Sequence, residues 1–73
     1  MAIKTNGDVA AKVRGTLAER RLKQADVASE VKLSRMAVHR RLSGETPFTP
    51  QELIAVAELC DVPVSTFFGE VAA

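Results

Sequence analysis

The chain has few cysteines and aromatic residues, which in other small domains form disulfides, metal sites or a large part of the core. Its single cysteine excludes an internal disulfide and leaves no cysteine cluster for a metal. Tryptophan and tyrosine are absent and phenylalanine occurs only three times, so the 47% hydrophobic residues must form a mainly aliphatic core. Seventy-three residues lie near the lower size limit for folding without a disulfide or metal. We therefore expect one helical domain over residues 1–73, ordered from about 8 to 68, without a metal or cofactor.

Long apolar runs are also missing from the chain. The longest are far too short to cross a bilayer, and the N-terminal segment MAIKTNGD does not resemble a secretion signal. Together with the single cysteine, these absences predict a soluble, cytoplasmic protein with no membrane partner.

The basic residues are unevenly distributed, and none follows Gly44. Residues 1–44 hold all ten Lys and Arg side chains against four acids, a formal charge of +6, whereas residues 45–73 hold five acids and no base, a charge of −5. Between Val31 and Gly44 every charged side chain is basic. Such a segment is typical of a surface that meets a polyanion, although a solvated helix face is the usual explanation of a short charge run.

Two short helices joined by a turn are predicted in residues 23–44. The first begins near Gln24. Its apolar face carries Val27, Ala28 and Val31, which are spaced for one side of a helix. The pattern is the first half of a helix-turn-helix, in which two short helices pack at a steep angle.

The second helix of this pair has its own start and stop signals. Ser34 supplies a side-chain oxygen suited to an N-cap, and Val38 and Leu42 form the inward face one turn apart. Ala37 is small enough to permit close packing. Gly44 can adopt the left-handed conformation that follows many helix ends.

A further helix is expected before this motif. Asp8 can cap it, and Val9, Val13 and Leu17 define its core stripe. Gly15 costs about 1 kcal/mol relative to alanine in a helix, and we interpret it as tolerated rather than required.

Two more helices are expected after the motif. Thr49-Pro50-Gln51-Glu52 combines an N-cap, a first-turn proline and a reciprocal glutamate, which is a capping box. The apolar positions from Leu53 to Cys60 cover about 220° of that helix, more than one core contact needs, so some of this surface is spare. A final short helix over residues 64–68 is expected to place Phe67 or Phe68 in the core.

The chain resembles the phage repressor and Cro type, or xenobiotic-response-element, helix-turn-helix transcription regulators. Residues from about Asp8 to Phe68 match this family in order and spacing, and the features that carry the likeness are Gln24, Val27-Ala28, Leu33-Ser34, Val38, Leu42-Ser43-Gly44, Pro47, Thr49 to Leu53 and Cys60 to Phe68. The resemblance implies an all-α, five-helix lambda-repressor-like domain whose second and third helices form the motif. It also implies a sequence-specific regulator that occupies operator DNA in bacteria or phage-infected cells.

In this family the second motif helix enters the major groove of double-stranded DNA. The resemblance therefore implies base contacts from Arg35, Met36 and Arg40, and the chemistry agrees, since arginine can bind guanine bidentately and methionine can touch a thymine methyl. Contacts to the DNA backbone are expected from the residues around them: Gln24, Ser34, Ala37, His39, Arg41, Ser43, Gly44 and Thr46. Exposure to solvent without any ligand is the alternative for each arginine.

Three positions depart from the family pattern. Lys32 stands where the family often has glycine, so either lysine adopts a positive φ or the turn has a different shape. Arg41 stands where an apolar residue is common, and Leu42 beside it would take over the packing. Lys23 replaces the usual Thr or Ser cap.

A homodimer on two half-sites is expected, because one recognition helix reads only a few base pairs. The candidate interface residues belong to the spare apolar surface and the tail: Val56, Leu59, Val64, Phe68 and Val71. Core burial is the alternative for Val64 and Phe68.

An enzyme fits the sequence poorly. His39 has no serine or cysteine nucleophile at a plausible spacing, and Cys60 lies in an apolar stripe typical of core. We therefore expect no small-molecule substrate. The alternative is a protein-interaction module on the same scaffold, such as an antirepressor or antitoxin, whose acidic C-terminal half binds a partner.

Overall fold

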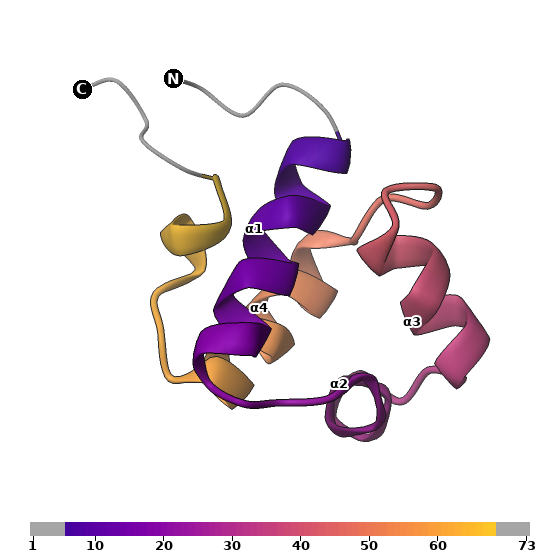
Figure 1. The fold of residues 1–73 in the computed structure, drawn as a ribbon, viewed down its shortest axis with the longest axis horizontal. Helices are drawn as coiled ribbons and strands as arrows, with labels where there is room; N and C mark the ends of the chain where they lie inside the picture. The colour runs from indigo at the N-terminus through magenta and orange to yellow at the C-terminus, as the bar shows by residue number, and fades with distance from the viewer. Residues whose placement is uncertain (1–5, 69–73) are drawn as a thin grey trace.

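Four α-helices and one 3-10 helix follow one another along residues 6–68, the part of the chain that the computed structural model describes. Figure 1 shows α1 (Asn6–Glu19) in the middle of the domain, with α2 (Gln24–Val31) and α3 (Arg35–Leu42) on one side and α4 (Pro50–Cys60) behind it. The predicted fifth helix is a short 3-10 helix, η1 (Val64–Phe68), on the side of α1 opposite α3 (Figure 1). No helix in this described range is long and apolar enough to span a membrane.

Helix α1 begins at Asn6, so Asp8 does not occupy the N-cap position before the helix that the sequence suggests. Asp8 lies in the first turn, where a carboxylate still interacts favourably with the helix dipole. The predicted stripe is confirmed in its main part, because Val13 and Leu17 are buried while Val9 packs against the core from a half-buried position.

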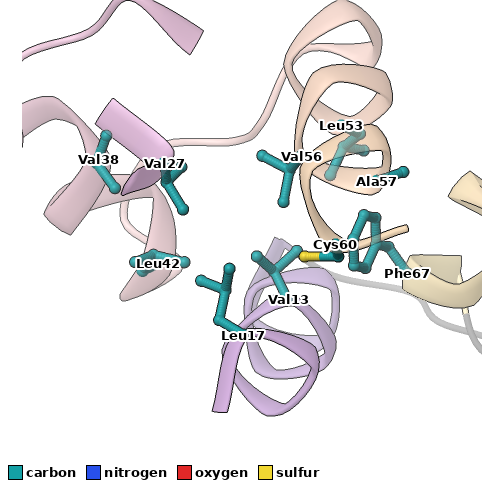
Figure 2. Close-up of a cluster of buried hydrophobic side chains, with 10 residues drawn as sticks. All are labelled: Val13, Leu17, Val27, Val38, Leu42, Leu53, Val56, Ala57, Cys60 and Phe67. Carbon is teal, nitrogen blue, oxygen red and sulfur yellow. The ribbon is translucent and has the colours of Figure 1, made fainter. Parts of the chain in front are cut away.

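The core joins all five helical segments. Figure 2 shows Val13 and Leu17 of α1 between the side chains of α4 and those of the motif helices. Phe67 is completely buried and Phe68 is 39% exposed, so η1 turns the first of the two aromatics inward. The buried cluster contains Val13, Leu17, Val27, Val38, Leu42, Leu53, Val56, Ala57, Cys60 and Phe67 (Figure 2).

Helix α4 shows which part of its wide apolar surface is spare. Val56 is completely buried and Leu59 is half-buried against the core, whereas Ile54 is 50% exposed. The placement of Val56 in a dimer interface is therefore wrong, because its side chain is enclosed by its own domain. The capping box at the start of α4 is confirmed by bonds between Thr49 Oγ1 and the Glu52 amide at 3.1 Å and between the Thr49 amide and Glu52 Oε1 at 3.0 Å.

Three helices end in a residue with a positive φ that is not glycine. Arg21 follows α1 with φ 56°, Lys32 follows α2 with φ 59° and Asp61 follows α4 with φ 58°. At Lys32 the first of the two expected alternatives therefore holds: lysine adopts the left-handed conformation, and the turn keeps the shape that glycine would give it.

Gly15 offers a test of the α1 packing. Replacing it by alanine is expected to raise the free energy of unfolding by about 0.5–1 kcal/mol. The reason is that a Cβ at this exposed mid-helix position would meet no atom within 4 Å, while alanine restricts the unfolded chain. Urea unfolding followed by circular dichroism measures the change. Gly44→Ala is the matched control and should destabilise, because Gly44 has φ 85°; lower stability in Gly15→Ala would contradict the interpretation that Gly15 is only tolerated.

Candidate nucleic-acid interface

Helices α2 and α3 pack directly on each other and are joined by a three-residue connection. The amides of Lys32 and Leu33 both donate to the Ala28 carbonyl, the second at 3.1 Å, so the left-handed Lys32 closes α2 and reverses the chain at once. Val27 of α2 is completely buried in the core. The connection therefore holds the two helices in a fixed mutual orientation.

Ser34 starts α3 as the sequence predicts. Its Oγ accepts a hydrogen bond from the Ala37 amide at 3.1 Å, and its carbonyl accepts the first bond of the helix from the Val38 amide at 3.1 Å. Val38 and Leu42 point into the core, with 0% and 4% of their surfaces exposed. Because this face is fixed by burial, the opposite face of α3 is turned to solvent.

The first turn and the outward face of α3 present the three residues expected to contact bases. Arg35 and Arg40 are exposed, and Met36 has 59% of its surface accessible. Within residues 6–68, neither arginine side chain is engaged in a hydrogen bond or ion pair. His39 is exposed on the same helix, and Ala37 is half-buried. Two guanidinium groups and a thioether are thus free to meet a ligand.

Arg41 is placed differently from the other arginines. Its Nε donates to Glu52 Oε1 at 2.8 Å, and its Nη1 donates to the Ala37 carbonyl at 3.1 Å. The two ion-paired side chains are only 16% and 15% exposed. A phosphate contact from Arg41 would require this pair to break, so the structure opposes the role expected from the sequence and assigns Arg41 to a contact between α3 and α4.

The C-terminal end of α3 is held from α1 as well. Arg14 Nη1 donates a hydrogen bond to the Leu42 carbonyl, one of the carbonyls that no helical amide satisfies. Sequence reasoning missed this contact, because Arg14 and Leu42 are 28 residues apart and no local pattern joins them.

The backbone amides after α3 are already hydrogen-bonded within the domain. The amides of Glu45 and Thr46 both donate to the Arg40 carbonyl, at 3.0 and 3.2 Å, and the Ser43 hydroxyl donates to the same oxygen at 2.9 Å. The Gly44 amide donates to the Arg41 carbonyl at 3.1 Å. These amides cap α3, so a phosphate contact from Ser43, Gly44 or Thr46, which stays a prediction, would need other groups of this segment.

The start of α2 carries Gln24 at its first helical position, exposed as a phosphate contact would require. Lys23 has an extended backbone, and its amide donates to Asp26 Oδ2 at 2.8 Å. The capping at this end thus comes from Asp26 and not from a Thr or Ser side chain, which accounts for the departure from the family pattern at Lys23.

The remaining candidate residues lie apart from the outward face of α3. Leu59 and Val64 are half-buried against the core, Phe68 is partly exposed, and Val71 lies outside the described residues. Cys60 is buried, and this burial raises the pKa of its thiol above its ordinary value while the nearby charge of Arg20 acts in the opposite direction. Across residues 6–68, no group of His, Cys, Asp and Glu side chains is arranged to hold a metal ion.

Comparisons with known proteins agree with this geometry. A family model described as "Helix-turn-helix" matches residues 14–67, which is 54 of the 73 residues. The structure is similar to that of the restriction-modification controller protein C.AhdI from Aeromonas hydrophila, with a TM-score of 0.78, 17% identity, and coverage of 86% of this chain and 96% of that one. It is also similar to a transcriptional regulator from Listeria innocua, with a TM-score of 0.76 and 23% identity.

The alignment with the Listeria protein covers 89% of this chain and 61% of that one, so this chain spans less than two thirds of its length. At such identities the two structures establish the fold alone. No curated protein matches the sequence.

Proposed function

Because the chain belongs to the Cro/C1-type helix-turn-helix family of DNA-binding transcription regulators, we propose that it binds a specific operator sequence through α3. In this proposal α3 lies in the major groove of double-stranded DNA, and the bound protein obstructs or assists the polymerase. The mode of action is that of a Cro-like or repressor-like phage protein.

One observation carries the proposal: the first turn and exposed face of α3 present Arg35, Met36 and Arg40, and neither arginine side chain has a partner in residues 6–68. A bidentate arginine contact to guanine O6 and N7 discriminates base pairs, and an apolar contact to a thymine methyl does the same for Met36. The distribution of charge also supports the assignment of α3 to the DNA side of the domain, since no Lys or Arg follows Gly44.

Contacts to the DNA backbone are assigned to the side chains next to this face. Ser34 and His39 are exposed on α3 or at its cap, and Gln24 is exposed at the start of α2, where the positive end of the helix dipole favours a phosphate. Phosphate contacts orient the protein, whereas base contacts specify the site. We assign neither Arg41 nor the amides of residues 43–46 to the DNA.

A symmetric dimer would let two copies of α3 read half-sites about one helical turn apart. Phe68 is the candidate among the described residues that retains appreciable exposure, and Ile54 joins it as an exposed apolar side chain of α4. Leu59 and Val64 can contribute only their half-buried edges.

The test is selection of duplexes from a random-sequence library, followed by affinity measurements on the selected duplex and a scrambled one at several salt concentrations. We expect one preferred sequence, and affinity that falls steeply with salt because bound phosphates release counterions. Weak binding that ignores sequence would instead favour the alternative of a protein-interaction module, such as an antirepressor or antitoxin, and would direct the search to a protein partner.

A further inference from the structure

We infer that Arg41 and Glu52 form a positioning pair, which sets the orientation of α3 against the body of the domain and thereby controls specific DNA affinity without touching DNA. The inference rests on the proposed function, because it concerns the same recognition helix. It assigns a role to Glu52, an acidic side chain, that electrostatic attraction to DNA would not predict.

The pair joins two helices whose main chains are not closely packed. Within residues 6–68, α3 packs closely on α1 and α2, whereas α4 packs closely on α2 and η1. The Arg41–Glu52 ion pair, at 2.8 Å, spans the space between α3 and the first turn of α4. A change in either side chain would therefore alter how α3 is held at its C-terminal end.

Both ends of this connection are fixed by further hydrogen bonds. Arg41 Nη1 donates to the Ala37 carbonyl one turn earlier in α3, so the guanidinium lies along its own helix. Glu52 Oε1 also accepts from the Thr49 amide at 3.0 Å, so the same oxygen caps α4 and binds Arg41. One carboxylate oxygen of Glu52 therefore serves both the α4 cap and the ion pair to the recognition helix.

Burial makes the pair sensitive to substitution. The Arg41 and Glu52 side chains are only 16% and 15% exposed, so removing one of them leaves the charge of the other poorly solvated. We expect the C-terminal end of α3 and the first turn of α4 to move apart so that water reaches this charge. At the end of α3, Arg14 still holds the Leu42 carbonyl and Leu42 stays in the core, so we expect the shift to take the form of a tilt of α3. Base contacts from Arg35 and Arg40 depend on that angle.

The experiment measures binding of wild type, Arg41→Gln, Glu52→Gln and the double variant to the duplex that wild type selects from a random library, and to a scrambled duplex. Glutamine at position 52 keeps an acceptor for the Thr49 amide, so α4 remains capped. Thr49→Ala is the control, because it removes the other half of the cap and leaves the ion pair in place. Circular dichroism identifies a temperature at which every variant is folded, and binding is measured at that temperature.

We expect each single variant to lose about tenfold in affinity for the selected duplex, and the double variant to lose no more than either, as residues of one network do. Glu52→Gln should bind the scrambled duplex as well as wild type or better, because it removes a negative charge. Thr49→Ala should melt at a lower temperature but keep its affinity for the selected duplex.

Two results would overturn the inference. If Glu52→Gln binds the selected duplex as tightly as wild type or more tightly, Glu52 acts only through its charge or not at all. If Arg41→Gln alone weakens binding to both duplexes and lowers the salt dependence by about one ion, Arg41 is a phosphate contact. Wild type that prefers no sequence would refute the proposed function itself, a failure visible before any variant is measured.

Discussion

Replacing both Arg35 and Arg40 by alanine is expected to abolish sequence preference while leaving weak binding to any duplex. Each bidentate arginine–guanine contact contributes about 1–3 kcal/mol of discrimination, equivalent to roughly 5- to 150-fold in affinity. Both side chains are exposed and unengaged within residues 6–68, so their removal should not disturb the fold. Fluorescence anisotropy with the selected and scrambled duplexes measures the ratio of the two affinities, which should approach one.

Lys12→Ala is the matched control for this experiment. Lys12 is exposed on α1 and lines a pocket together with Thr66 of η1. Helix η1 lies on the side of α1 opposite α3 (Figure 1). Removal of the Lys12 side chain takes away one positive charge without touching the recognition face, and should leave the preference for the selected duplex intact. If Lys12→Ala lowers that preference as much as the arginine variants do, net charge and not base contact explains the binding.

Phe67→Ala should produce the largest loss of stability of any substitution considered. Phe67 is completely buried and fills the space between α1 and α4 in Figure 2. Truncating a buried phenylalanine costs about 3–5 kcal/mol. A domain of 73 residues has a total stability of only about 4–11 kcal/mol. Thermal unfolding followed by circular dichroism should show a melting temperature lower by roughly 15–30 °C.

The neighbouring aromatic supplies the control for the same measurement. Phe68 is 39% exposed, so Phe68→Ala removes much less buried surface and should lower the melting temperature by only a few degrees, about 1 kcal/mol or less. Equal losses in the two variants would mean that η1 does not direct Phe67 inward in solution.

Features set by neighbouring residues could be predicted from the sequence. The Ser34 cap, the capping box of Thr49 and Glu52 and the left-handed Gly44 each depend on contacts within a few residues, and the structure confirms all three. The motif helices could also be placed, because Val27, Val38 and Leu42 leave one choice of inward face. Exposure of the α3 surface follows from that choice.

Features that depend on packing were beyond the sequence. The apolar surface of α4 is so wide that its inward direction is ambiguous, which is why Val56 was expected at an interface while Ile54 is the residue left outside. The choice between Phe67 and Phe68 likewise depends on where η1 lies relative to α1 and α4. Local patterns cannot decide either case, since both faces satisfy the same helical periodicity.

The largest differences in the candidate site come from contacts between distant residues. An arginine at a position where the family often has an apolar residue signals that a partner is needed, but only the fold identifies Glu52. The sequence also does not indicate that the amides of Glu45 and Thr46 bond to the Arg40 carbonyl, because this depends on the path that the chain takes at Gly44.

The separation of charge has a kinetic consequence. The recognition helix and η1 lie on opposite sides of α1 (Figure 1), and every Lys and Arg precedes Gly44 while residues 45–73 are purely acidic. In the field of a polyanion such a molecule experiences a torque as well as an attraction. The torque turns the side that carries α3 toward the polyanion before contact. On the proposed function, we expect a larger share of collisions to begin in the productive orientation, and association with DNA to be faster than the net charge of only +1 would suggest.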